Sequence, residues 1–275
     1  MNWEHVVQCL KLALGILLII RLFSTKLYRA YKLFCGFLIA DLSGLLLYVL
    51  NKVFGVISSY FYFIAWLTLE PVIWLFTLLM VYSLLEKILV QLPGLLRLSR
   101  RLLHLVFLIA LAIGLTSARY EYSAPGFAAA LKVKRFIVQC WISEMVFDRV
   151  VASTALLTLL AIAGFLLWFP VRIPRNLAAF SIGFAVYFTA MTVLLLTRSL
   201  WPNEALKIVT EVLKVFNLLM GSVSGICFAF WIFLLSPAGE FVPSTMVIQR
   251  QPQEQERLIA QLELINDALL KTARR

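Results

Sequence analysis

Charged residues are scarce in this chain of 275 residues, in which Asp, Glu, Lys and Arg make up 14% and hydrophobic residues 62%. Soluble domains have about 25% charged and roughly 45–50% apolar residues. A soluble fold of this length would lack the polar side chains that its surface needs, which excludes a soluble globular protein. Cysteine is also sparse. Because Cys9, Cys35, Cys140 and Cys227 form no CxxC pair, we expect free thiols, with a Cys9–Cys140 bridge as the alternative.

Signatures of catalysis, nucleotide binding and metal binding are absent from the sequence. No HExxH, GxSxG, P-loop or Gly-rich dinucleotide motif occurs. The two histidines, His5 and His104, are expected on opposite sides of the protein. We therefore predict a non-enzymatic protein with no cofactor and no metal. The net charge of +11 does not indicate nucleic-acid binding, because the basic residues are scattered and no nucleic-acid motif accompanies them.

The chain contains many long apolar runs. A run of about 20 apolar residues can span a bilayer, and backbone groups in lipid must be satisfied within the segment, which favours helices. We therefore predict an all-α, polytopic membrane protein: a bundle of seven transmembrane helices with a short C-terminal cytoplasmic helix, and the lipid bilayer as its first partner. The predicted spans are Val6–Phe23, Leu33–Leu50, Tyr60–Leu85, Leu102–Thr116, Phe136–Trp168, Leu177–Leu196 and Val212–Leu235.

The end of the chain differs from the rest. We predict a transmembrane domain over residues 1–236, a linker over 237–251 and an amphipathic cytoplasmic helix over 252–275. Apolar residues at four-three-four spacing are typical of a short coiled coil, here Leu258, Leu262, Ile265 and Leu269. A helix of under three heptads is marginal alone. We expect it to bind a second copy, another protein or the membrane surface, or else to lie on the cytoplasmic loops.

Lys and Arg between the apolar runs predict the orientation. The first connection is short and strongly basic, with Arg21, Lys26, Arg29 and Lys32. Fewer basic residues, among them Lys11, are assigned to the opposite side. By the positive-inside rule, the N-terminus is expected outside and the C-terminus in the cytoplasm. A cleavable signal peptide is not expected, because no basic segment precedes the first run.

Ionisable side chains inside predicted spans are the strongest functional candidates, because each costs a few kcal/mol in lipid unless it is paired or hydrated. Glu70 lies near the middle of the third run, directly before Pro71. A proline can kink a helix and free a carbonyl beside the acid. Such a site would suit a proton, a cation or a ligand amine. The alternative is a protonated Glu70 that hydrogen-bonds a neighbouring helix.

Asp41 lies about halfway through the second run, amid Gly36, Ala40 and Gly44. This row of small residues allows another helix to approach closely, so an interhelical hydrogen bond of Asp41 inside a tight contact is the expected role. A proton or ion site remains the alternative.

Glu144 and Asp148 are one helical turn apart in the fifth run, with Arg149 beside them. Arg149 could neutralise one acid or reach another helix. The two acids are expected either in water at the interface or at the mouth of an extracytoplasmic cavity, as ligand or proton site candidates.

Two surface features indicate contact with the bilayer. Arg97, Arg100, Arg101 and His104 form a stripe at helical spacing, whose natural partner is anionic lipid head groups. The aromatic run Tyr60–Trp66 is typical of an interfacial belt that anchors a helix.

Three stretches carry a resemblance: "YFYFIAWLTLE" from Tyr60 to Glu70, "FDRV" from Phe147 to Val150, and "LELINDALLKTARR" from Leu262 to Arg275. With its hydropathy layout, the chain resembles uncharacterised bacterial seven-helix integral membrane proteins and, more loosely, the seven-helix input regions of sensor histidine kinases. The resemblance implies the bacterial inner (plasma) membrane. It also implies that the last helix continues towards an output carried by another polypeptide.

The leading hypothesis is a non-enzymatic membrane module of sensor or receptor type that relays a signal to a cytoplasmic partner. A proton- or ion-coupled transporter or channel using Glu70 or Asp41 is the first alternative. A structural subunit of a membrane complex is the second, and an enzyme acting on lipids the third. Retinal binding is not expected, because Gly221–Gly225 in the middle of the last run contains no lysine.

Overall fold

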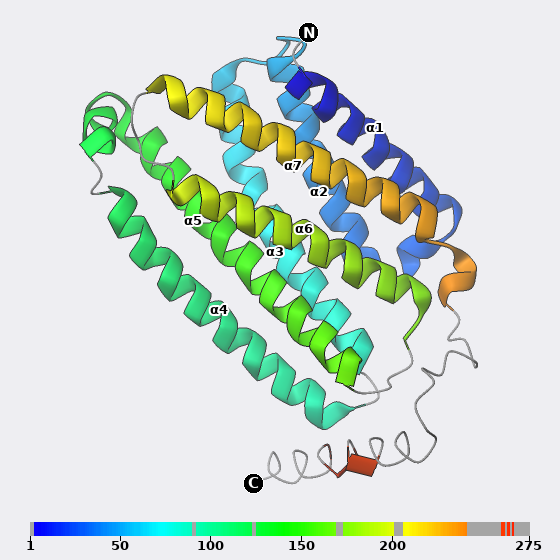
Figure 1. The fold of residues 1–275 in the computed structure, drawn as a ribbon. Helices are drawn as coiled ribbons and strands as arrows, with labels where there is room; N and C mark the ends of the chain where they lie inside the picture. The colour runs from blue at the N-terminus through cyan, green and yellow to red at the C-terminus, as the bar shows by residue number, and fades with distance from the viewer. Residues whose placement is uncertain are drawn as a thin grey trace.

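The computed structural model describes residues 3–89, 92–122, 125–168, 173–200 and 206–240, and positions 260, 261, 263, 264 and 266. Within these ranges the chain is all-helical and has no strand, which confirms the predicted class (Figure 1). The elements are α1 (Trp3–Ser24), η1 (Leu27–Arg29), α2 (Lys32–Lys52), α3 (Ser59–Leu89), α4 (Pro93–Tyr122), α5 (Pro125–Trp168), α6 (Arg175–Leu200), α7 (Leu206–Leu234) and η2 (Pro237–Glu240), where η marks a 3-10 helix.

Six helices in the described ranges are long and apolar enough to cross a membrane. They comprise α1, α2 and α3 in full, with Val146–Leu166 of α5, Arg175–Leu195 of α6 and Lys214–Leu234 of α7. The predicted fourth span, Leu102–Thr116, lies within α4, which is not one of these six. The structure thus supports a multi-pass membrane protein with six spans, and the seventh span stays a prediction.

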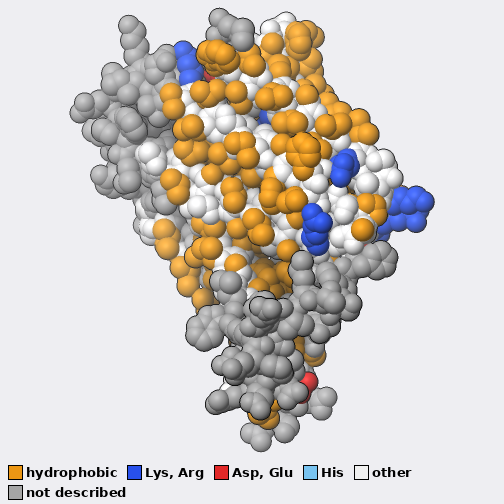
Figure 2. Space-filling model, turned by 45° about the vertical axis from the view of Figure 1, so that its right-hand side comes forward, with side chains coloured by type: hydrophobic (Ala, Val, Ile, Leu, Met, Phe, Trp, Pro, Cys, Tyr) orange, Lys and Arg blue, Asp and Glu red, His pale blue; other side chains and the backbone are white. Residues whose placement is uncertain are grey.

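The six apolar helices form a closed ring. Neighbours pack in the order α1, α2, α3, α5, α6, α7 and back to α1, while α4 lies outside the ring against α5 and α3 (Figure 1). Large apolar side chains cover much of the described outer surface in Figure 2. Phe233 of α7 is 82% exposed, and Ile226, Leu75 and Leu10 are also exposed. An outer surface this apolar fits lipid rather than water.

Glycines let the helices of the ring approach one another closely. A Cβ atom on Gly36 would lie 2.4 Å from Phe76 of α3, and one on Gly44 would lie 3.2 Å from Leu69. On α7, a Cβ on Gly221 would lie 2.9 Å from Val7 of α1. The small-residue rows therefore serve helix packing, as predicted. All four cysteines are free, also as predicted.

Aromatic side chains fill the interior of the helix ring, near the end where α1 stops and α2 starts. We call Phe34, Phe180, Phe184, Phe188 and Trp231 the aromatic plug; each is at most 2% exposed. The ring centroid of Trp231 lies 4.6 Å from that of Phe184 and 5.1 Å from that of Phe34. The indole Nε1 of Trp231 donates a hydrogen bond to the Ala179 carbonyl at 3.3 Å. This plug closes the interior of the bundle at one end.

Gly183 of α6 makes room for Trp231, because a Cβ there would lie 2.5 Å from the indole Nε1. We expect Gly183→Ala to lower the free energy of unfolding by about 1–3 kcal/mol through overpacking. Gly164→Ala is the matched control, since nothing lies within 4 Å of its Cβ position and alanine favours a helix. Unfolding in mixed micelles measures both, and equal stability of the two variants would contradict the close packing.

Candidate functional site: an acidic cavity inside the helix ring

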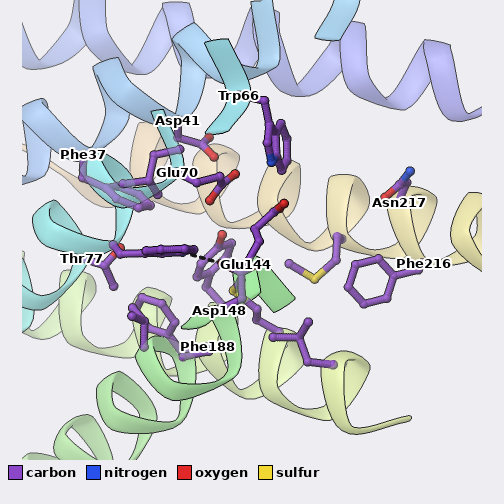
Figure 3. Close-up of a pocket in the computed structure, with 18 of the residues that line it drawn as sticks. Phe37, Asp41, Trp66, Glu70, Thr77, Glu144, Asp148, Phe188, Phe216 and Asn217 are labelled. Atoms are coloured by element: carbon purple, nitrogen blue, oxygen red, sulfur yellow. Dashed lines mark hydrogen bonds between the residues drawn. The ribbon is translucent and has the colours of Figure 1, made fainter. Parts of the chain in front are cut away.

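A cavity of about 410 Å³ lies inside the ring, between α2, α3, α5, α6 and α7 (Figure 3). It extends from the start of α3 down to the aromatic plug. Its lining residues are Phe37, Asp41, Tyr62, Phe63, Trp66, Glu70, Ile73, Trp74, Thr77, Glu144, Asp148, Val151, Ala152, Tyr187, Phe188, Met191, Leu195, Phe216, Asn217 and Met220. The volume is in the range of small-molecule sites, which are roughly 300–1,000 Å³.

Four acidic side chains from three helices meet at this cavity: Asp41 of α2, Glu70 of α3, and Glu144 and Asp148 of α5. Figure 3 shows their carboxyl groups directed towards one another across the space. These are the four acids that the sequence marks separately, and the ring brings them into one site. Glu144 and Asp148 line this cavity, and the extracytoplasmic side expected for it stays a prediction. Arg149 is not among the lining residues.

Lys11 of α1 is a further residue of the site, which the sequence pattern did not mark. Its Nζ lies 3.0 Å from Oδ2 and 3.2 Å from Oδ1 of Asp41, and both side chains are largely buried. The same ammonium lies 5.8 Å from the ring centroid of Phe228 on α7. Asp41 therefore forms an ion pair within the membrane region, which is stronger than the hydrogen bond expected for it. The signal that could have identified it is that Lys11 is an ionisable residue inside the first predicted span.

Trp74 fixes the position of Asp148. The indole Nε1 of Trp74 donates a hydrogen bond to Oδ1 of Asp148 at 2.6 Å, shown by the dashed line in Figure 3, and its ring stacks on Phe147 at 5.2 Å. Helix α3 continues through Pro71, so Glu70 and Trp74 lie one turn apart on the same face. A carboxyl group that accepts a short, buried hydrogen bond is held in one orientation.

The aromatic run at the start of α3 was predicted as an interfacial anchor, and the structure divides this run between two surfaces. Tyr60 and Phe61 are exposed, as an anchor requires. Tyr62, Phe63 and Trp66 instead line the cavity. Successive residues of a helix point in different directions, so one run supplies both the outer belt and the cavity wall.

A second polar cluster joins α1, α2 and α7 beside the cavity. Oε1 of Glu4 accepts hydrogen bonds from the Tyr48 hydroxyl at 2.7 Å and from Nδ2 of Asn217 at 3.1 Å. Nε2 of Gln8 donates to the Asn217 carbonyl at 3.1 Å. Asn217 also lines the cavity, so it connects this cluster to the site. The sequence analysis did not identify these residues, because only the fold brings them together.

Below the plug, η2 is tied to the ring. The fully buried Asn176 of α6 donates through Nδ2 to the Ser236 carbonyl and to Oε1 of Glu240, both at 2.7 Å. Lys87 of α3 donates to the Ala30 carbonyl and lies 3.9 Å from the ring centroid of Tyr31. Burial and the nearby Glu240 carboxylate raise the pKa of the Tyr31 hydroxyl, so this residue stays protonated. The segment that follows α7 is thus tied to α6, and its Glu240 lies near Tyr31.

The predicted basic stripe lies on α4, outside the cavity. Arg97, Arg101 and His104 are exposed, while Nη2 of Arg100 lies 2.9 Å from Oε1 of Glu86 on α3. Contact of the stripe with lipid head groups stays a prediction.

The predicted partner-helix residues of the C-terminal tail, Leu258, Leu262, Ile265 and Leu269, lie outside the described residues. Among the described tail positions, Asn266 accepts a hydrogen bond from the Gly94 backbone N–H at 2.7 Å through Oδ1. That contact places Asn266 at the start of α4.

Metal binding has no geometric support in the described residues, where no group of three or more His, Cys, Asp or Glu side chains is placed to hold an ion. No family model, curated protein or solved structure matches this chain.

Proposed function

We propose that this chain is an integral membrane module of the sensor or receptor type, which binds a ligand in the acidic cavity and relays its occupancy to a cytoplasmic partner. The observation that carries the proposal is the cavity, with four acids inside a ring of apolar helices. Ionisable residues are rare within membrane-spanning helices and mark functional sites there. The aromatic plug supports a receptor over an open pore, because it fills the path from the cavity to the other end.

The relay would run through the helices that line the cavity. A ligand between α3, α5 and α7 shifts their packing if it binds two arrangements with different affinity. Helix α7 leads into η2, which Asn176 and Glu240 tie to α6. The contact between Asn266 and Gly94 links the tail to α4. Movement of α7 could thereby change how the tail presents its apolar residues to a partner or to a second copy.

The proposed location is the bacterial inner membrane, with the N-terminus outside and the C-terminus in the cytoplasm. Arg21, Lys26, Arg29 and Lys32 lie around the end of the ring that the plug closes. The positive-inside rule assigns that end to the cytoplasm. The cavity then faces the extracytoplasmic side, where a sensor would meet its ligand.

A transporter is the second candidate. The acids occur at more than one depth, since Glu144 and Asp148 lie a helical turn apart along α5. A series of acidic side chains along a cavity is typical of ion or proton paths. In this case the plug would have to open during each cycle, and flux into proteoliposomes would accompany ligand binding. Binding without flux favours the receptor.

Deleting residues 252–275 tests the relay. Purification in mild detergent at native expression level, followed by mass spectrometry, should recover a stoichiometric protein with the full chain and lose it with the truncated chain. Retention of the partner by the truncated chain, or recovery of the full chain alone, would contradict a relay through the tail. Unchanged α-helix content of the truncated chain by circular dichroism serves as the folding control.

A further inference from the structure

A second cavity, of about 240 Å³, lies between α3, α4 and α5, apart from the acidic cavity. We call it the α4 groove, and its described lining residues are Leu85, Ile88, Leu89, Leu95, Leu98, Ser99, Leu102, Leu103, Val106, Leu157, Thr158, Ala161, Ile162 and Phe165. Twelve of these residues are apolar, and none is charged. The hydroxyl of Thr158 donates to the Thr154 carbonyl at 2.7 Å, so it needs no hydrogen bond from a guest. The groove therefore favours an apolar guest.

The α4 groove opens towards the hydrocarbon of the bilayer. Leu98, Leu102 and Leu157 line it and are 38%, 50% and 51% exposed, so they form its mouth. Helix α4 lies outside the ring beside α5 (Figure 1), and its exposed apolar residues continue with Leu105, Leu108 and Ile109. A cavity lined by Leu, Ile and Phe stays dry and can hold a hydrocarbon, for which about 150 Å³ suffices in the case of benzene. The acyl chain of a lipid is the hydrocarbon that this surface meets.

The length of the α4 groove fits one leaflet of a bilayer. On α4 it extends from Leu95 to Val106, and eleven helical residues rise about 16 Å. The hydrocarbon core is about 30 Å thick, so one leaflet accounts for about 15 Å of it. Leu95 lies near the start of α4 and Leu89 at the end of α3, so the groove begins at the end of the bundle that the aromatic plug closes. An acyl chain from that leaflet therefore matches the groove along its whole length.

Two arginines of α4 lie near the start of the groove. Arg97 and Arg101 are exposed, and neither forms an ion pair with a described residue. Arg101 directly precedes Leu102 and follows Leu98 by three residues, so it adjoins the mouth on the helix surface. Helical side chains tilt towards the N-terminus of their helix, which for α4 is the plugged end. Arg100 is instead paired with a carboxylate of α3. The two exposed cations favour an anionic head group at this end.

We propose that the α4 groove binds a phospholipid with an anionic head group. One acyl chain lies in the groove, and the phosphate contacts Arg101 and Arg97 at the plugged end. The bound chain adds apolar contacts between α4 and the helices of the ring against which it packs. This site is separate from the acidic cavity, and it does not rest on the function proposed for that cavity.

Three probes separate the role of the acyl chain from that of the head group. Phosphatidylglycerol carries an anionic phosphate, phosphatidylcholine carries the same chains with a zwitterionic head group, and glycerol phosphate carries the anion without chains. The full-length protein, purified in mild detergent, is titrated with each probe, and native mass spectrometry counts the bound molecules. We expect one phosphatidylglycerol to bind at least fivefold more tightly than phosphatidylcholine, and glycerol phosphate not to displace it.

Ala161→Phe tests where the acyl chain lies, because the added ring would fill the groove. We expect this variant to lose most of the bound phosphatidylglycerol. Ala163→Phe is the matched control, since Ala163 is also exposed on α5 but is not among the described lining residues. It should bind the lipid as the unchanged protein does. Circular dichroism shows whether both variants fold, and the smaller change Ala161→Leu replaces Ala161→Phe if the latter does not.

Arg101→Gln tests the contact with the head group. It should weaken phosphatidylglycerol binding about fivefold and leave phosphatidylcholine binding unchanged, because one basic residue at an anionic lipid surface contributes about that factor. Arg29→Gln removes an exposed cation of η1 at the same end of the bundle. This control should leave the affinity for both lipids unchanged.

Three results would overturn the proposal. If Ala161→Phe and Ala163→Phe retain phosphatidylglycerol equally, the acyl chain does not lie in the groove. If phosphatidylglycerol and phosphatidylcholine bind equally well, the site does not select an anionic head group. If the protein retains no phospholipid and is a dimer that Ala161→Phe dissociates, the groove is occupied by a second copy of the chain.

Discussion

Lys11→Met is expected to lower the free energy of unfolding by about 3–5 kcal/mol, because it leaves the Asp41 carboxylate without its partner inside the helix ring. The ammonium of Lys11 lies 3.0 Å from Asp41, and the two side chains are 12% and 16% exposed. Unfolding of the purified protein and of the Lys11→Met variant by SDS in mixed micelles measures the difference in their free energy of unfolding.

A second substitution distinguishes loss of the ion pair from loss of packing. Replacing the pair by Lys11→Met with Asp41→Leu should restore most of the stability, since apolar residues of similar volume commonly replace a buried pair at little cost. Lys52→Met, at an exposed position in the last turn of α2, should change stability by no more than about 0.5 kcal/mol. A double variant as unstable as Lys11→Met would show that the pair is not the cause.

Trp231→Ala is the other change with a large expected effect, a loss of about 3–5 kcal/mol. Trp231 is 1% exposed and lies among Phe34, Phe180 and Phe184, so its removal leaves a void at the centre of the aromatic plug. Phe184 packs against Trp231 on one side and against Phe188, which lines the acidic cavity, on the other. Thermal unfolding measures this loss of stability.

Phe233→Ala is the matched control for Trp231, two residues along the same helix but 82% exposed on the outer surface. In micelles it should change stability by less than about 1 kcal/mol, because its ring has apolar surroundings in either state. Equal losses for the two variants would mean that the plug is not the packed centre of this end of the bundle.

Sequence alone located the helices well, and the reason is physical. Six predicted spans lie in apolar helices of the ring, because length and hydropathy are local properties that the bilayer constrains. The same argument marked Asp41, Glu70, Glu144 and Asp148, since an acid within an apolar run stands out wherever the run packs. The four acids line one cavity because α3 packs against α5 as well as against α4. Which helices pack against one another is a tertiary property.

The residues that the sequence pattern did not mark are those whose role depends on their contacts in the folded protein. Lys11 was assigned to orientation although it lies inside a predicted span, and its contact with Asp41 required the pairing of α1 and α2. Asn217 and Thr77 are ordinary polar residues of apolar helices, and only their place on the cavity wall distinguishes them. Tyr62 and Trp66 belong to a run typical of a membrane belt, and their direction within α3 separates them from Tyr60.

Sided cysteine labelling tests the central claim, that the cavity is reached from the side opposite the basic connections and closed by the plug. Met191→Cys places a thiol on the cavity wall and Ser24→Cys places one at the plugged end, with the four native cysteines replaced by alanine. In intact cells, a membrane-impermeant thiol reagent should label Met191→Cys and should leave Ser24→Cys unlabelled until the membrane is opened. Labelling of Ser24→Cys in intact cells with protection of Met191→Cys would contradict the account.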